Sequence, residues 1–304
     1  MKPTTFITAL LSTGLICGGC ESDVNFTGKE AAAKMVLNSM IDCSDSSHFI
    51  KVSESVFVFS DQEPKSIDNP NLELTLNGLP VAVTYDHSVK ENAYYKFDAL
   101  LHPGDKIEIA GYSQAHGHVA GTDIVPNPPQ ILAVTPEWFT GTEDGISYLR
   151  TKIRIKDRPN EDNYYRIVIH TKTVFIENNP DEINWHTSEV YLDQEILFKD
   201  IAGTLGNTDT NLFAIFSDEI FQGQEYSLNV YIQEDNFSAW GARQQHVNVE
   251  IHSLSGNLYR YLRSLELAAN DDYFSEPVKI FSNINGGYGI LGTYTMDQMT
   301  IEIK

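Results

Sequence analysis

The sequence is poor in cysteine. Only Cys17, Cys20 and Cys43 occur among 304 residues, and the first two lie in a segment that we interpret below as a signal and lipid anchor. Because the one remaining thiol cannot form an intramolecular disulfide, the fold depends on its hydrophobic core rather than on covalent cross-links. A chain of this length can bury such a core, most simply in two domains.

Basic residues are also scarce. The chain has 21 Lys and Arg against 42 Asp and Glu, which gives a formal net charge of −21 at pH 7. A field of this sign repels nucleic acid and anionic lipid head groups. We therefore expect no nucleic-acid partner, and we exclude a basic surface as the means of membrane attachment.

Long hydrophobic runs are missing as well. The apolar stretch at residues 6–16 is too short to span a bilayer, but it has the length of a secretory signal. It ends in Gly18-Gly19-Cys20, and small residues directly before a cysteine are typical of a lipoprotein cleavage site. An ordinary secretory signal is the alternative interpretation.

The cleavage pattern predicts three features of the N-terminus. Residues 1–19 form a lipoprotein signal peptide, Cys20 carries a covalent lipid that includes palmitate, and residues 20–34 form a tether. Acidic residues follow at positions 21 and 23. Their place resembles the signal that directs lipoproteins of Bacteroidota to the cell surface, so we expect an outer-membrane protein that faces the cell exterior.

The first half of the chain reads as short strands separated by turns. Residues 71–85 alternate between apolar and polar side chains on both sides of Asn77-Gly78. Asn and Gly tolerate the positive φ that tight hairpins need, so this stretch predicts a hairpin. Strands with turns about every ten residues favour a sandwich. We predict an immunoglobulin-like β-sandwich over residues 35–125.

A proline-rich segment separates this half from the next. Residues 126–130 predict a stiff linker, followed by a second antiparallel β domain over residues 131–304. The expected strands are residues 149–156, 164–176, 188–199, 211–216, 226–233 and 246–252. One helix is expected at residues 254–269, where leucines recur on one face. The predicted fold class is therefore mainly β, with one amphipathic helix near the C-terminus.

A glycine pattern near the C-terminus has the residue spacing of a dinucleotide-binding loop but not its structural context. The segment NINGGYGILGTYT contains Gly287-x-Gly289-x-x-Gly292. Such a loop follows a strand and opens a helix, whereas residues 293–295 are strand formers. We therefore interpret the glycines as bends or close backbone contacts between strands.

The same region carries a family resemblance. Residues 256–295 resemble the C-terminal signature of a Bacteroidota lipoprotein family, catalogued as domain of unknown function 4249. The common features are a helix rich in Tyr and Leu, the run FSEPV, and SNI followed by glycines. Cys20 and the first strand, MVLNSMI, fit the same pattern. The resemblance implies a surface lipoprotein, often encoded beside starch-utilisation-type TonB-dependent transporters, and it implies no catalytic residue.

Enzyme signatures are missing from the sequence. It has no G-x-S-x-G, no H-E-x-x-H and no EF-hand loop. His116 and His118 are a candidate zinc pair without a third ligand nearby. Asp157, Glu161 and Asp162 are candidate calcium ligands, with a solvated turn as the alternative. We predict no enzyme, no catalytic residue, no metal, and no cofactor other than the covalent lipid.

One predicted strand is strongly basic on one face. In LRTKIRIK, residues 149–156, the side chains of Arg150, Lys152, Arg154 and Lys156 point to one side. They either protect an edge strand from pairing with another chain or pair with acids on a neighbouring strand. Binding of a ligand is the third interpretation.

A polar segment between two strands carries exposed aromatic candidates. QEDNFSAWGARQQ contains Phe237 and Trp240, with Arg243 beside them, and PEWFTG contains a similar pair, Trp138 and Phe139. Aromatic residues on loops stack on sugar rings or anchor a partner. The alternative is that they pack onto their own domain. We predict that Phe237, Trp240 and Arg243 bind a ligand or partner.

Together these features predict a non-enzymatic function at the outer membrane. The expected function is that of an accessory or substrate-capture subunit of a TonB-dependent nutrient transporter. Its expected partners are the transporter, a glycan or peptide ligand, and membrane lipid through the anchor. A structural or adhesive surface lipoprotein is the alternative, and a glycan or peptide hydrolase is the third candidate.

The anchor makes a direct prediction. Replacing Cys20 by Ser removes the thiol that accepts the lipid, so Cys20→Ser should abolish acylation and release the protein from the membrane fraction. Metabolic labelling with a fatty acid and membrane fractionation measure both. Retention of the variant in the outer membrane, together with an unlabelled wild type, would contradict the lipoprotein interpretation.

Overall fold

The computed structural model of the chain describes residues 32–57, 63–67, 69–89, 92–140, 147–175, 186–187, 192, 196–199, 212–233, 242–269 and 278–303. The predicted signal peptide, residues 1–19, and Cys20 lie outside these ranges. Within the described ranges, no helix is long and apolar enough to cross a membrane.

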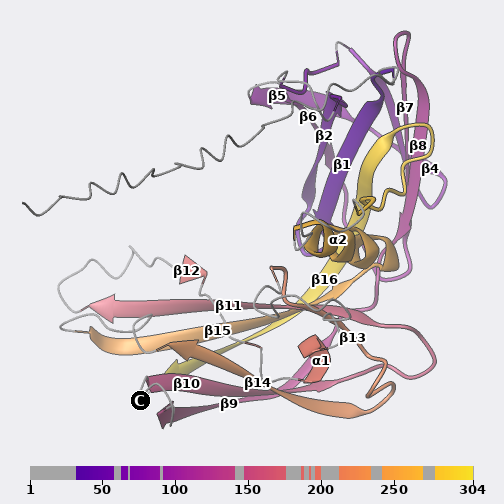
Figure 1. The fold of residues 1–304 in the computed structure, drawn as a ribbon. Coiled ribbons are helices and arrows are strands. Elements are labelled where there is room, and N and C mark those ends of the chain that lie inside the picture. Colours follow the sequence, from indigo (N-terminus) through magenta and orange to yellow (C-terminus); the bar gives the residue numbers. More distant parts are fainter. Residues whose placement is uncertain are drawn as a thin grey trace, which may run out of the picture. The chain divides into compact units, whose positions relative to one another are not determined.

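The described chain is mainly β-structure, and its longest helix lies near the C-terminus (Figure 1). The elements are β1 (Met35–Asp42), β2 (Ser47–Glu54), β3 (Asn71–Leu76), β4 (Leu79–Val81), β5 (Thr84–Val89), β6 (Asn92–Asp98), β7 (Lys106–Ser113), β8 (Gly117–Ile124), β9 (Gln130–Thr140), β10 (Ser147–Lys156), β11 (Tyr164–Phe175), β12 (His186–Thr187), α1 (Ile196–Lys199), β13 (Ile215–Ser217), β14 (Glu225–Gln233), β15 (Ala242–Leu254), α2 (Gly256–Ala269) and β16 (Tyr288–Ile303). The mainly β fold class with one amphipathic helix near the C-terminus is confirmed.

Three sheets contain the strands that the structure describes. The largest has the order β12–β11–β15–β16–β1–β2–β6–β5, with β13 also paired to β11. A four-stranded sheet has the order β4–β3–β7–β8, and a three-stranded sheet has the order β14–β10–β9. The pairing of β1 with β16 is parallel, and the other pairings between these strands are antiparallel.

The first half of the chain forms a β-sandwich, as predicted. Strands β1, β2 and β6 of the large sheet contribute Leu37, Ile50 and Phe97 to a core that also contains Ile107 and Ile109 of β7. The burial pattern of β7 alternates residue by residue, because successive side chains of a strand point to opposite faces. The other face of each strand is therefore free to carry polar side chains.

The predicted hairpin in this half is confirmed. Asn77 and Gly78 join β3 to β4 with φ angles of 53° and 79°. Both residues tolerate positive φ, which the tight two-residue turn requires.

A second core lies between the three-stranded sheet and strands β11, β15 and β16. Leu149 and Ile153 of β10 and Leu228 of β14 belong to the same buried cluster as Ile169 of β11 and Val249 of β15. Figure 1 shows β9, β10 and β14 facing β11 and β15. The antiparallel second half is thus a two-layered structure with its own core.

One predicted strand in this half is wrong in part. Ile196–Lys199, inside the expected strand at residues 188–199, form the single-turn helix α1. Phe198 is buried, and its ring centroid lies 5.6 Å from that of Phe216. A short apolar run without alternation is ambiguous between helix and strand, and tertiary packing decides between them.

Strand β16 takes part in both cores. It pairs with β1 from Val36↔Tyr288 onward and with β15 as far as Gln245↔Ile303. Leu291 belongs to the first core, and Ile303 belongs to the second. The division of the chain at residues 126–130 stays a prediction, and the large sheet contains strands from both sides of it.

Helix α2 packs against β16. It follows Ser255, whose hydroxyl accepts the Leu258 N–H at 3.2 Å and so caps the helix N-terminus. Leu258 and Leu262 are buried, which confirms the predicted apolar face. The helix begins two residues later than expected because Leu254 is still part of β15.

The glycine segment has the structural role expected of it. Gly292 lies inside β16, where an added Cβ would sit 2.8 Å from Leu258 Cβ, so only glycine lets α2 approach this closely. Gly289 has φ +115°, and an added Cβ would sit 1.9 Å from the carbonyl oxygen of Leu37. A strand, not a helix, follows these glycines, so the segment is not a dinucleotide-binding loop.

Asp123 of β8 holds these elements together. Its Oδ2 accepts hydrogen bonds from the Thr293 N–H at 2.7 Å and the Thr293 hydroxyl at 2.8 Å, and its Oδ1 accepts one from the Asn257 side-chain amide at 2.9 Å. Burial raises the pKa of this carboxyl, although the hydrogen bonds oppose the shift. One buried side chain therefore links β8, β16 and the first turn of α2.

The close contact at Gly289 leads to a stability prediction. Gly289→Ala should lower the free energy of unfolding by more than about 2 kcal/mol, because positive φ and backbone overlap both oppose a side chain. Gly104→Ala is the matched control, since Gly104 has φ +87° but nothing within 4 Å of an added Cβ. Its loss should be about 1 kcal/mol. Equal losses in urea denaturation would contradict the role of close contact.

Candidate functional site

The residues predicted to bind a partner are only partly within the described structure. Phe237 and Trp240 lie outside the described residues, as does Cys20. Arg243 lies in β15, at the point where the pairing of β15 with β11 shifts register beside Phe175. The prediction that these residues bind a ligand or partner remains a prediction.

The structure shows where the two aromatic-rich segments adjoin the β14–β10–β9 sheet. The β9–β10 hairpin ends with the pair Ser147↔Thr140, and the next pair is Tyr148↔Phe139. Tyr148 also pairs with Gln233, the last residue of β14 before the segment that carries Phe237 and Trp240. Thr140 of PEWFTG and Gln233, the first residue of QEDNFSAWGARQQ, therefore lie at one end of the same sheet, which sequence reasoning did not foresee.

Aromatic side chains gather at this end of the sheet. Phe139 and Tyr148 each contact Tyr231 edge to face, with ring centroids 6.3 Å and 6.5 Å apart. The Phe139 side chain remains 38% exposed, and Trp138 remains 41% exposed. Since successive residues of a strand alternate, Trp138 and Phe139 point to opposite faces of β9. Phe139, Tyr148 and Tyr231 form the group that we call the aromatic cluster.

The basic strand lies next to this cluster. Strand β10 is the central strand of its sheet, so the interpretation of its cations as protection of a sheet edge is wrong. Pairing with acids is confirmed for two of them: Arg150 pairs with Glu137, and Arg154 lies 4.0 Å from Glu225. Periodicity revealed the basic face, but only strand order shows that it is the middle of a sheet.

The candidate zinc pair serves the local structure instead. The His116 ring lies 2.9 Å from the Ser113 hydroxyl and 3.3 Å from a Glu54 carboxylate oxygen. The His118 ring packs against Tyr112 at 4.4 Å. Among the described residues, no group of three His, Cys, Asp or Glu side chains is arranged to hold a metal ion.

The candidate calcium ligands are engaged in separate contacts. Asp157 is buried and accepts hydrogen bonds from the Tyr165 hydroxyl at 2.5 Å and the Gly223 N–H at 2.6 Å. Glu161 accepts the Asn127 side-chain amide at 3.1 Å. These contacts anchor the turn between β10 and β11. Asp157 and Glu161 bind different partners.

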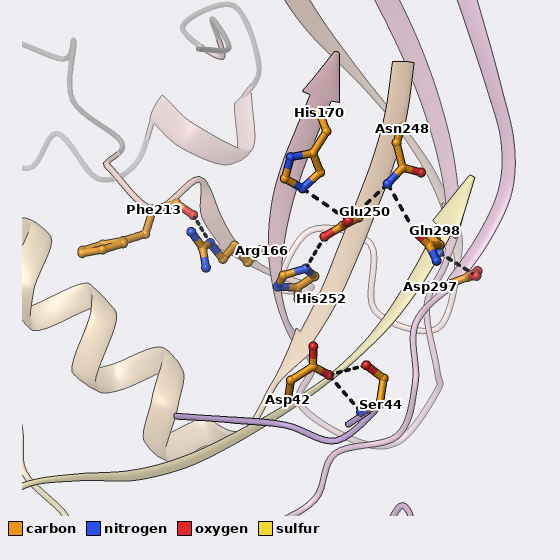
Figure 2. A network of polar contacts seen from close by, with 10 residues as sticks. All are labelled: Asp42, Ser44, Arg166, His170, Phe213, Asn248, Glu250, His252, Asp297 and Gln298. Atoms are coloured by element: carbon orange, nitrogen blue, oxygen red, sulfur yellow. Dashed lines mark hydrogen bonds and ion pairs between the residues drawn. The ribbon is translucent and has the colours of Figure 1, made fainter. Parts of the chain in front are cut away.

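A polar network covers the outer face of the large sheet in the second half of the chain (Figure 2). The carboxylate of Glu250 in β15 lies 3.1 Å from His252 Nε2 and 3.3 Å from His170 Nε2 of β11. Asn248 donates to Glu250 at 3.1 Å and to Gln298 of β16 at 3.2 Å. Sequence reasoning missed this network, although polar residues at 248, 250 and 252 share one face of a predicted strand.

The electrostatics of the network centre on Glu250. The His252 hydrogen bond, with support from His170, lowers the pKa of the Glu250 carboxyl despite partial burial. His252 also stacks on Tyr294, with ring centroids 4.8 Å apart. Burial lowers the pKa of nearby Arg166, whose Nε donates to the Phe213 carbonyl at 3.2 Å.

This arrangement can hold a carboxylate in its charged form. A serine- or cysteine-type nucleophile requires a hydroxyl or thiol within hydrogen-bond reach of the base. The side chains bonded to Glu250 are two imidazoles and an amide. The described side-chain contacts of Glu250 thus join β11 to β15 and include no hydroxyl or thiol.

Comparison with known proteins identifies the family. Residues 21–300 match the family model described as domain of unknown function, DUF4249. The chain belongs to the DUF4249 family. The match covers the strands from β1 to β15, α2 and β16 as far as residue 300, and it confirms the resemblance inferred from the C-terminal motif. No curated protein matches the chain.

Cys43 is the one free thiol among the described residues of this DUF4249 protein. It lies just after β1, and burial, with help from the charge of Asp42, raises the pKa of the thiol to about 12. The thiolate is the reactive form of cysteine, so the side chain is unsuited to nucleophilic chemistry near neutral pH.

The charge network predicts a specific response to acid. A carboxylate with a lowered pKa contributes stability above its usual pKa of 4.5 and loses that contribution as pH falls through the lowered value. Wild-type stability should therefore decrease below about pH 5. Glu250→Gln should be less stable than wild type at pH 7 and lose less on acidification, as measured by urea denaturation.

A matched variant isolates this effect. Glu225 of β14 also faces a basic residue, Arg154, but both side chains are more than half exposed. Glu225→Gln should leave the acid response near that of wild type, because exposed pairs contribute little. An unchanged acid response in Glu250→Gln would show that the network does not act through its charge.

Proposed function

We propose that this DUF4249 protein is an outer-membrane lipoprotein, anchored through Cys20 and facing the cell exterior. It acts as a non-enzymatic accessory or substrate-capture subunit of a TonB-dependent nutrient transporter. The lipid confines the protein to the membrane plane in which the transporter lies, which raises the effective concentration of each for the other.

The proposal rests on the aromatic side chains that gather at one end of the β14–β10–β9 sheet. The aromatic cluster, with the half-exposed Trp138 nearby, lies at the end of the sheet that contains Thr140 and Gln233. Exposed aromatic residues at loop ends provide rigid contact area for a ligand or partner. Phe237 and Trp240 follow Gln233 closely in the sequence, which supports their proposed role with Arg243 in binding.

The chemistry of the described side chains favours capture over catalysis. His116 contacts the Ser113 hydroxyl and the Glu54 carboxylate, and His170 and His252 contact the Glu250 carboxylate. These partner groups already have a role in the fold. Burial suppresses the ionisation of Cys43. These facts support a binding function and give no support to the third candidate, a glycan or peptide hydrolase.

A structural or adhesive surface lipoprotein is the alternative. It needs the same anchor and the same exposed faces, so the two proposals differ in the partner. Purification of the lipidated protein from native membranes in mild detergent, followed by mass spectrometry, distinguishes them. A TonB-dependent transporter as the main co-purified protein supports the proposal, whereas fibre or pilus subunits support the alternative.

The binding segment gives a variant test. Trp240→Ala should reduce co-purification of the transporter or retention of the ligand at least about fivefold, with a nearly unchanged melting temperature. Tyr112→Ala, an exposed aromatic residue of β7, is the control and should leave binding intact.

If the Trp240 ring instead packs within its own domain, the same variant should lose about 3 kcal/mol of stability. Full binding by a stable Trp240→Ala protein would eliminate this segment as the site.

A further inference from the structure

The outer face of the β14–β10–β9 sheet carries a row of cations along its central strand. Arg150, Lys152, Arg154 and Lys156 alternate with core residues such as Ile153, so their side chains leave the sheet on the side away from the core. Alternate residues of a strand lie roughly 7 Å apart, and the row is roughly 20 Å long.

Half of this positive charge is uncompensated by ion pairs within the described residues. Arg150 pairs with Glu137, and Arg154 lies near Glu225. Lys152 has Thr135 and Asn229 opposite it on the neighbouring strands, and neither carries a charge. Lys156 lies opposite Glu225, the acid whose carboxylate is 4.0 Å from Arg154. Lys152 and Lys156 are both exposed, and no ion pair joins either to an acid in the described part of the chain.

The aromatic cluster continues the same face at one end of the row. Tyr231 lies directly opposite Arg150 in the pairing of β10 with β14, and Tyr148 lies two residues before Arg150 on β10. Phe139 pairs with Tyr148 on the β9 side. Residues that pair directly share a face of the sheet, so the three rings and the four cations form one surface. We call it the β10 face.

We propose that the β10 face binds an extended anionic polysaccharide, in which carboxylated sugars alternate with uncharged ring faces. The lysines attract the carboxylates, and the rings of the aromatic cluster pack against sugar rings. This assignment rests on the proposed capture function and names its substrate class. Strand geometry supplies the linear match, because cations at a regular spacing suit a ligand with regularly repeated charges.

Charge density favours this ligand over nucleic acid. The chain as a whole has a net charge of −21, and a polymer with one phosphate per nucleotide meets strong repulsion from it. A polysaccharide with sparse carboxylates needs only a few cations, which is what the β10 face supplies. Two acids, Glu137 and Glu225, lie on the same face and further disfavour a densely charged polymer.

The test is direct binding of hyaluronate, in which carboxylated sugars alternate with uncharged ones, to the full lipidated protein in neutral detergent. Binding is measured by affinity electrophoresis and biolayer interferometry. Wild type should bind hyaluronate, with weaker binding at higher salt, and should bind uncharged dextran at least about tenfold less tightly. Lys152→Glu combined with Lys156→Glu should weaken binding at least about tenfold. Phe139→Ala should weaken it at least about threefold.

Matched variants control for charge and for folding. Lys96→Glu combined with Lys106→Glu changes the net charge equally at two strand positions of the first half, each already beside an acid. This control should bind like wild type. If the double glutamate variant has a lowered melting temperature, Lys152→Gln combined with Lys156→Gln takes its place. Lys152→Arg combined with Lys156→Arg keeps both charges and should retain binding.

Four outcomes would overturn the proposal: no binding of hyaluronate, equal binding of dextran, equal loss in the control pair, or tighter binding of single-stranded DNA than of hyaluronate. Co-purification of the transporter is measured in parallel on the same variants. Transporter binding without polysaccharide binding refutes the β10 face and leaves the accessory function standing. If the wild-type protein neither binds the polysaccharide nor co-purifies with the transporter, the proposed function itself is refuted.

Discussion

Strand β16 carries the constraint on which the rest of the structure depends. One edge of it pairs with β1 and the other with β15, so a single strand belongs to both halves of the large sheet. Gly289 and Gly292 let the neighbouring backbone and α2 approach it closely. Asp123 then secures Thr293 to β8. Loss of this pairing would remove residues from both cores at once, so their stabilities are coupled.

The same pairing determines which faces remain for function. Because each sandwich buries one face of its strands, polar side chains collect on the outer faces. On the large sheet they form the His170–Glu250–His252 network, in which two imidazoles hold one carboxylate. On the three-stranded sheet they form the β10 face, where no ion pair joins Lys152 or Lys156 to an acid among the described residues. The first arrangement stabilises the fold, and we propose that the second binds a ligand.

Much of the fold was predictable from local patterns. Alternation and the Asn77-Gly78 turn predicted the strands of the first sandwich, and leucine spacing predicted α2. The strand formers after Gly292 excluded a nucleotide loop, and the C-terminal motif indicated the family that the comparison confirms. Predictions failed where local pattern is ambiguous. Ile196–Lys199 form a helix, and the basic strand is central rather than an edge.

The candidate site divides in the same way. The sequence by itself determined the acidic charge, the basic face of residues 149–156 and the aromatic pair at 138–139, because these are properties of neighbouring residues. Only the tertiary structure decided that β14 brings Tyr231 beside that face and that β11 brings His170 to Glu250. The partners in these pairs are about 80 residues apart, and strand pairing at such a separation depends on packing of the whole core rather than on local periodicity.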